Sequence, residues 1–86
     1  MKIKFHKYFE KKYQKLPQKI KSKVKERLNI FLQDPFATIL NNHALTGNYS
    51  GYRSVNVTGD IRMIYKLEND SLAVFVTIGS HSELYS

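Results

Sequence analysis

The residues best suited to chemistry lie in the second half of the chain, at predicted strand ends and turns. They are two of the three histidines, one aspartate and two arginines: His43, His81, Asp60, Arg53 and Arg62. Histidine exchanges protons near neutral pH, and the planar guanidinium of arginine donates paired hydrogen bonds to phosphate. The combination therefore suits cleavage of a phosphodiester, in which charge that develops in the transition state must be stabilised.

Each titratable residue also has a purely structural interpretation. His81 follows Gly79 at the end of an apolar strand, so it is either exposed for acid–base work or caps the final turn. His43 lies in a loop, where it either takes part in catalysis or makes a local turn bond. Asp60 follows Gly59, and it either orients a histidine, acts as a base or completes an ordinary hairpin turn.

The arginines and the last tyrosine present similar alternatives. Arg53 shares its parity with Val55 and Val57, so simple alternation puts it on the covered face of its strand unless a bulge or strand end turns it outward. Arg62 either binds phosphate or pairs with a carboxylate to support the fold. Tyr85 either packs the C-terminal segment or stacks on a base and relays a proton.

The elements that must position these residues follow from the apolar periodicity. Residues 2–5 alternate as a short edge strand, and two amphipathic helices follow, one ending before Pro17 and one running from Pro17 to Asp34. Residues 36–50 are expected to form a connection rich in turn formers. Three antiparallel strands joined by tight turns come last, at residues 52–57, 61–67 and 72–78.

The predicted fold class is α+β, with an N-terminal strand and a helical hairpin packed on a twisted antiparallel sheet. We expect residues 1–86 to form one domain whose chemistry lies on the face opposite the helices. The apolar run at 72–78 predicts a strand buried on both faces. No cysteine occurs, which excludes thiolate metal sites, and no apolar run is long enough to span a membrane, so we expect a cytoplasmic protein.

The net charge of +7 is unevenly distributed. Residues 1–33 carry eleven Lys or Arg and two Glu, giving +9, whereas residues 34–86 carry three basic and five acidic residues, giving −2. A basic segment of this density favours a polyanion or an acidic protein as partner, although a solvated helical face is an equal alternative. Most of the positive charge therefore lies outside the candidate site.

Four blocks in the second half occur in an order and spacing that resemble the RelE superfamily of bacterial toxins, and most of all its YafQ branch. They are His43-Ala44-Leu45-Thr46-Gly47, Gly51-Tyr52-Arg53, Gly59-Asp60-Ile61-Arg62-Met63-Ile64-Tyr65 and Ile78-Gly79-Ser80-His81-Ser82-Glu83-Leu84-Tyr85. They span residues 43–85, about half of the chain. The resemblance implies a RelE-like fold and a small ribonuclease that an antitoxin holds silent.

The resemblance also implies a role for each position. The implied catalytic residues are His81, His43, Asp60 and Tyr85, and those implied to bind substrate or phosphate are Arg53, Arg62 and Asn56. The implied reaction is cleavage of translated messenger RNA on the ribosome, by attack of the 2′-hydroxyl on the adjacent phosphate, without a metal or cofactor. The implied partners are a cognate antitoxin, messenger RNA and ribosomal RNA.

Two positions depart from the family pattern. Asn56 replaces a histidine and Ile61 replaces a frequent tryptophan. Asn56 can hydrogen-bond a phosphate but cannot exchange a proton near neutral pH, so activity would be weaker or His81 and His43 would carry the acid–base work alone. Two other interpretations remain: a noncatalytic ParE-like toxin that binds a topoisomerase, and a basic RNA-binding module.

Overall fold

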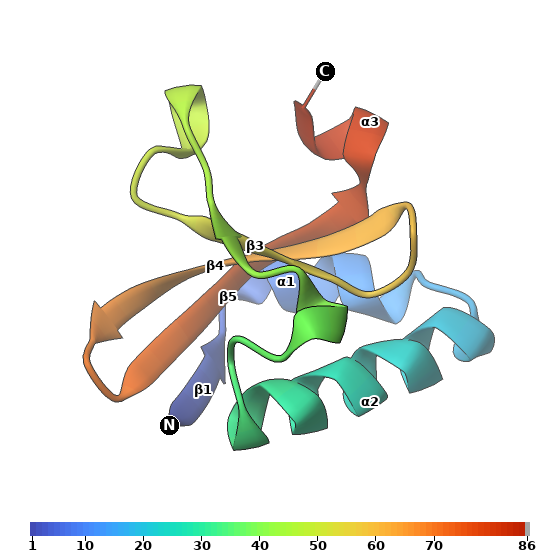
Figure 1. Cartoon of the computed structure of the whole chain (residues 1–86). Coiled ribbons are helices and arrows are strands. Elements are labelled where there is room, and N and C mark those ends of the chain that lie inside the picture. Colours follow the sequence, from blue (N-terminus) through green and yellow to red (C-terminus); the bar gives the residue numbers. More distant parts are fainter. Residues whose placement is uncertain (86) are drawn as a thin grey trace.

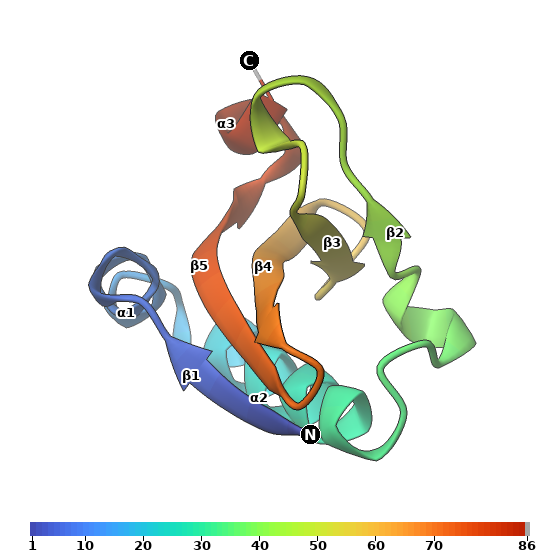
Figure 2. The same ribbon diagram turned by 90° about the vertical axis from the view of Figure 1, so that its left-hand side faces the viewer.

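The secondary structure follows the predicted periodicity closely in the computed structural model, which describes residues 1–85. The elements in chain order are β1 (Lys2–Phe5), α1 (Lys7–Gln14), α2 (Gln18–Gln33), the short 3-10 helix η1 (Thr38–Leu40), β2 (His43–Ala44), the 3-10 helix η2 (Gly47–Tyr49), β3 (Arg53–Asn56), β4 (Ile61–Asn69), β5 (Leu72–Ser80) and α3 (His81–Tyr85). The strands form one twisted sheet in the order β1-β5-β4-β3-β2 (Figure 1, Figure 2).

Helices α1 and α2 begin and end where local chemistry favours it. The ring Nδ1 of His6 accepts the backbone N–H of Tyr8 at 3.0 Å, so His6 is the N-cap of α1. Pro17 immediately precedes α2, and its φ of −58° suits entry into a helix. Asp34 ends α2 in an extended conformation, as expected before Pro35. The predicted helical hairpin is therefore confirmed.

One face of the sheet is covered by α2 and carries the hydrophobic core (Figure 1). Phe31 of α2 is fully buried, and its ring packs edge-to-face on Tyr65 and Phe75, with centroids 5.0 and 5.2 Å apart. Helix α1 packs along β5 and adds Phe9, whose ring lies 6.1 Å from that of Phe75. These aromatic contacts stabilise the helices on the sheet, because large rings bury much apolar area and prefer such edge-to-face geometry.

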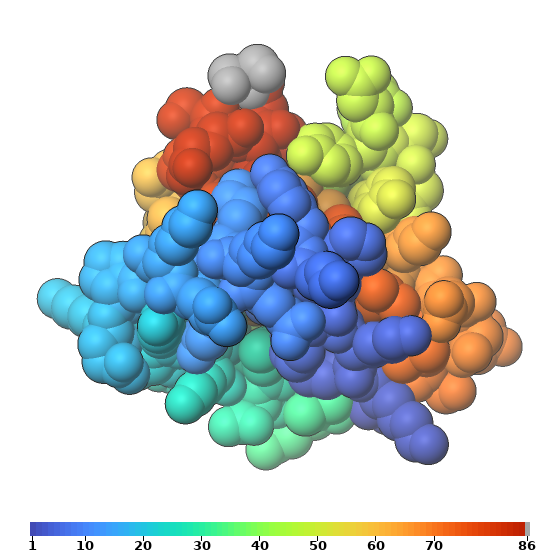
Figure 3. Space-filling model, turned by 180° about the vertical axis from the view of Figure 1, so that it is seen from behind, coloured from blue at the N-terminus to red at the C-terminus, as the bar shows by residue number. Residues whose placement is uncertain are grey.

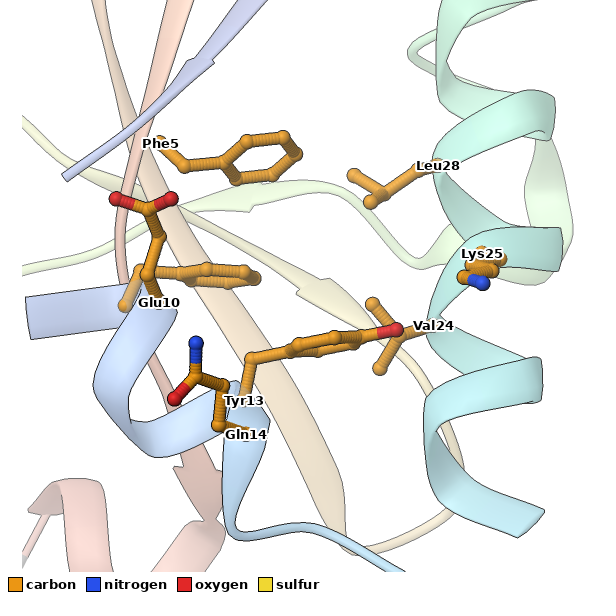
Figure 4. Close-up of a pocket in the computed structure, with 8 residues that line it drawn as sticks. Phe5, Glu10, Tyr13, Gln14, Val24, Lys25 and Leu28 are labelled. Atoms are coloured by element: carbon orange, nitrogen blue, oxygen red, sulfur yellow. The ribbon is translucent and has the colours of Figure 1, made fainter. Parts of the chain in front are cut away.

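An apolar cavity of about 400 Å³ remains among β1, α1 and α2 on the covered face (Figure 4). Phe5 faces Leu28 across it, and the ring of Tyr13 faces Val24 (Figure 4). The lining is mostly apolar, and its polar members are Glu10, Gln14 and Lys25. Because it lies in the helix layer and contains no histidine or arginine, the cavity does not suit phosphate chemistry.

The opposite face of the sheet, here called the open face, carries no helical layer among residues 1–85. Lys4, Val74 and Lys66 pair across it on β1, β5 and β4. Val74 and Val76 are only half-buried, so the prediction that the last strand is buried on both faces is wrong for them. Branched residues suit a pleated surface even where solvent reaches it, so an apolar run alone does not establish two covered faces.

The predicted α+β class, with its helical hairpin on one face, is confirmed, but the sheet differs in two details. β1 pairs in parallel with β5, so the sheet is mixed. Within the predicted connection at residues 36–50, His43–Ala44 pairs with β3 as a two-residue strand. Such a short strand has no periodicity to detect, and its pairing depends on residues far along the chain. No helix within residues 1–85 has the length and apolarity needed to cross a membrane.

Candidate functional site

Helix α3 begins directly where β5 ends, and His81 is its first residue. A reciprocal cap fixes this start: the Ser80 N–H donates to Glu83 Oε1 at 2.9 Å, and the Glu83 N–H donates to Ser80 Oγ at 3.2 Å. The bond from the Ser80 backbone, with smaller contributions from the Ser80 hydroxyl and Lys12, lowers the pKa of the Glu83 carboxyl. The Ser-x-x-Glu pattern is readable in the sequence, from which we predicted only a turn.

Asp60, in the turn between β3 and β4, contacts the start of α3. The His81 N–H donates to the backbone oxygen of Asp60 at 3.1 Å and lies 3.3 Å from its carboxylate Oδ1. Thr58 shapes the turn, because its Oγ1 accepts the N–H groups of Asp60 and Ile61 at 3.2 and 2.9 Å. The carboxylate therefore meets the backbone of His81 and holds the histidine in place from the neighbouring turn.

Arg62 and Asn56 lie side by side on the open face, where β4 and β3 pair. Arg62 Nη1 donates to Asn56 Oδ1 at 2.7 Å, and Nη2 donates to the Gly59 carbonyl at 3.3 Å. A guanidinium has five N–H donors, so three remain for another acceptor, including the buried Nε, which has no partner within residues 1–85. Arg62 also pairs with Gly79 of β5, two residues before His81.

His43 lies at the far edge of the same face. It is opposite Ser54 in the β2–β3 pairing, and Ser54 shares a strand face with Asn56. The Nδ1 of His43 lies 2.8 Å from the Asn41 carbonyl, which can only accept, so this hydrogen bond needs the ring hydrogen on Nδ1. Within residues 1–85 no hydrogen bond joins His43 to His81.

Arg53 does not join these residues. The β3–β4 register runs without a bulge from Arg53 to Asn56, so alternation keeps Arg53 on the helix-covered face. Its Nε donates to Asn42 Oδ1 at 2.8 Å, and its guanidinium lies over the Phe36 ring at 5.3 Å. Asn42 in turn donates to the Tyr65 hydroxyl at 2.7 Å. The side chain of Arg53 is thus turned away from His81, so its position does not support the expectation that Arg53 binds the phosphate.

Tyr85 lies one helical turn after His81, and their ring centroids are 4.8 Å apart. Its ring also meets that of Tyr49 edge-to-face at 6.0 Å, and Tyr49 meets Tyr52 at 6.1 Å. Sequence reasoning missed Tyr49 and Tyr52, because they come from a segment that acquires its place only when it folds up beside α3 (Figure 1). The only local signal was two tyrosines three residues apart.

Five residues thus gather at one end of the open face, and we call them the polar cluster: Asn56, Asp60, Arg62, His81 and Tyr85. The set combines an imidazole and a phenol, which can transfer protons, with a guanidinium and an amide, which can bind anionic oxygens. Within residues 1–85 no three His, Asp or Glu side chains are placed to hold a metal ion. The arrangement suits binding of a phosphate and exchange of protons with its ester oxygens.

Comparison with known proteins gives this geometry a context. A family model described as "Bacterial toxin of type II toxin-antitoxin system, YafQ" matches residues 1–86. Over 51 residues the chain is 37% identical to the mRNA interferase toxin YafQ of Escherichia coli strain K12, a match that covers 59% of this chain. It covers 54% of that relative, so the aligned part spans about half the length of the curated protein.

Solved structures agree with the family match. The crystal structure of YafQ from E. coli strain BL21(DE3) superimposes with a TM-score of 0.79 at 29% identity, covering 98% of this chain and 97% of the other. The E. coli DinJ-YafQ toxin-antitoxin complex also contains a similar chain, with a TM-score of 0.76 at 29% identity and coverage of 98% and 96%. The similarity extends over nearly the whole fold, beyond the blocks at residues 43–85.

Proposed function

The chain belongs to the YafQ family of bacterial toxins of type II toxin–antitoxin systems, and from this premise we propose that it is an endoribonuclease that cuts messenger RNA. The polar cluster carries the proposal. Asp60 and the cap of α3 hold His81 at the end of β5, one helical turn before Tyr85. Arg62 of β4 pairs with Gly79 at that end of β5. A similar E. coli protein bears the name mRNA interferase toxin, which supports the same activity.

The proposed reaction uses the RNA as its own nucleophile. The 2′-hydroxyl attacks the adjacent phosphorus, so the P–O2′ bond forms and the P–O5′ bond breaks. A base accepts the 2′-hydroxyl proton, an acid returns a proton to the leaving 5′-oxygen, and the product is a 2′,3′-cyclic phosphate. His81 provides one of these transfers, since an imidazole suits both directions near neutral pH.

Arg62 stabilises the phosphorane in this proposal. Two of its N–H groups are held by Asn56 and Gly59, which orient the guanidinium and leave its other donors for the equatorial oxygens. Tyr85 or His43 carries the second proton transfer. Tyr85 is the nearer to His81, and His43 lies on the same face at its edge.

The lysine-rich helices are assigned to binding rather than to chemistry. Residues 1–33 carry the excess of +9, and the one ion pair within residues 1–85 joins Lys23 and Glu26 at 3.8 Å. The remaining ammonium groups suit a polyanion, and we assign them to ribosomal RNA during cleavage of translated messages in the cytoplasm. An antitoxin partner is proposed by analogy with the DinJ-YafQ complex.

Expression of the His81→Ala variant tests the proposal. The wild-type chain without an antitoxin should arrest growth and create new 5′ ends in cellular messages, mapped by primer extension. His81→Ala should lower cleavage by about 100-fold or more, the range of a lost acid–base group. Ser22→Ala is the control, because Ser22 is exposed on α2 and lies outside the polar cluster. Undiminished cleavage by folded His81→Ala would exclude the proposed role of His81.

The same experiment separates the alternative functions. A ParE-like toxin that acts on a topoisomerase would arrest growth without new 5′ ends in messages. A simple RNA-binding module would bind RNA in a strongly salt-dependent way. It would not cleave RNA, so the wild-type chain and His81→Ala would behave alike. The arrangement of the polar cluster favours the nuclease, since neither alternative needs a histidine at the end of β5, two residues after the glycine that pairs with Arg62.

A further inference from the structure

A groove runs along the open face next to the polar cluster and is not used by the proposed chemistry. It has a volume of about 640 Å³ and lies between the N-terminal segment and the segment at residues 46–52. Figure 3 shows this side of the molecule, with the 46–52 segment in yellow-green, the start of the chain in blue and the β4–β5 hairpin in orange. Val74 and Val76 of β5 line it.

Aromatic rings connect the groove to His81. Tyr85 packs against His81, Tyr49 against Tyr85, and Tyr52 against Tyr49, with successive centroids 4.8, 6.0 and 6.1 Å apart. Tyr49 and Tyr52 line the groove, and both are only half-buried. The rings therefore form a continuous row that leads away from the polar cluster along the sheet.

Positive charge accompanies this row. The Lys66 ammonium lies 5.7 Å from the centroid of the Tyr52 ring, and Lys4 of β1 faces the groove from its other side. Both lysines are exposed, and both pair with Val74 across the sheet. Glu68 is the one acidic residue that lines the groove, so two ammonium groups face a single carboxylate.

We propose that this groove binds a few nucleotides of single-stranded RNA that flank the scissile phosphate. The inference rests on the proposed ribonuclease activity and extends it to a substrate-binding surface. Tyrosine faces stack on any base, and lysines neutralise the backbone phosphates, so the combination suits a single strand with little sequence preference. The half-buried valines add apolar contact with the stacked bases.

An acidic segment of the antitoxin is the competing occupant. Its carboxylates would bind the lysines but gain little from a row of aromatic faces. A nucleotide strand uses both, because its phosphates bind the lysines and its bases stack on the tyrosines. The row of rings also links the groove to His81, beside which the scissile phosphate is proposed to lie, as a substrate strand requires and an inhibitor does not. The RNA therefore explains more of the observed chemistry.

The test uses RNA oligonucleotides that carry 2-aminopurine at successive positions, with the full chain as His81→Ala to prevent cleavage. Stacking on tyrosine should quench the fluorescence at a short run of positions on one side of the cleavage point. Tyr49→Leu or Tyr52→Leu should abolish the quenching and weaken binding by about 5- to 150-fold, the range that corresponds to loss of one stacked base. Tyr49→Phe should retain both, because it keeps the ring.

Lys66→Glu provides a second variant, because Lys66 is exposed and its replacement should not disturb the fold. It should weaken binding and reduce the salt dependence of the affinity, whereas Lys25→Glu on the helix side should have a smaller effect on the same short RNA. Unchanged quenching and affinity in folded Tyr49→Leu, Tyr52→Leu and Lys66→Glu would overturn the groove assignment. So would loss of antitoxin binding without any loss of RNA binding.

The two proposals fail in different ways. Ring-dependent quenching without cleavage by the wild-type chain would leave the groove standing and refute the nuclease. Cleavage of short RNA at the same kcat/KM by wild type and Tyr49→Leu would refute the groove and leave the nuclease standing.

Discussion

Arg53 donates its Nε hydrogen to Oδ1 of Asn42 at 2.8 Å, on the face of the sheet turned away from His81. The Asn42 amide also donates to the Tyr65 hydroxyl and to the Pro35 carbonyl, at 2.7 and 2.9 Å. Arg53 and Tyr65 belong to blocks that resemble the toxin superfamily, yet both meet at the residue that precedes His43. The residues that resemble the superfamily therefore include some that stabilise the edge strand as well as groups suited to catalysis.

Replacing Arg53 by Leu should therefore reduce stability more than it reduces chemistry. The substitution leaves Asn42 Oδ1 without its donor, which costs about 1–3 kcal/mol when the acceptor is partly buried. Urea denaturation measures the loss, with Lys19→Leu as a control at an exposed position of α2. In a double-mutant cycle with Asn42→Ala, purely additive losses would show that the two side chains do not act together.

Asn56→His restores the histidine that the family pattern places in this strand. It adds a titratable group beside Arg62, so kcat/KM for RNA cleavage should rise by about tenfold or more, and the pH profile should gain a further limb near neutrality. Asn56→Gln is the control, since it lengthens the side chain without adding a proton-exchanging group. If the histidine variant cleaves no faster than wild type over the whole pH range, Asn56 lies outside the reacting geometry.

Substitutions of Asp60 separate positioning from proton transfer. Asp60→Asn keeps an oxygen for the His81 N–H, so cleavage should stay within a few-fold of wild type. Asp60→Ala loses that acceptor and should lower kcat by about two- to tenfold, the equivalent of one ordinary hydrogen bond. Single-turnover cleavage measures both variants. A loss of more than 100-fold in Asp60→Asn would instead identify Asp60 as a base.

The cap of α3 should respond to acid. The pKa of Glu83 is lowered in the folded chain, so its carboxylate stabilises the helix start fully above the ordinary glutamate value of 4.5 and loses this effect as the pH falls through the lowered value. The amide proton of Ser80, which donates to Glu83, should shift in NMR spectra over that acidic range. Glu83→Gln keeps an acceptor without the charge, and the Ser80 amide should then show no such titration.

A Ser80 amide that titrates identically in Glu83→Gln would show that another group controls the start of α3. Lys12→Ala offers an independent check, because Lys12 contributes to the lowered pKa of Glu83. In that variant the transition should move to higher pH, toward the ordinary value of glutamate.

Much of the fold and part of the site could be predicted from local patterns. The alternation of Arg53 with Val55 and Val57 correctly indicated the covered face, because side-chain direction in a regular strand depends only on parity. His81 was predicted at the end of the last strand, although the helix that carries it was missed. Val74 and Val76 were wrongly predicted to be buried, since an apolar residue in a strand gives the same sequence pattern whether or not a layer covers it.

The sequence by itself determined the helical stripes, the strand parities and the residue types able to exchange protons or bind phosphate, because these depend on side chains a few positions apart. Only the tertiary structure decided that Asp60 contacts His81 and that Tyr49 packs on Tyr85. It also decided that the side chain of Arg53 is turned away from His81. Those relationships join residues distant along the chain through strand order and turn geometry. Their pairing is set by the packing of the whole sheet, which no local pattern contains.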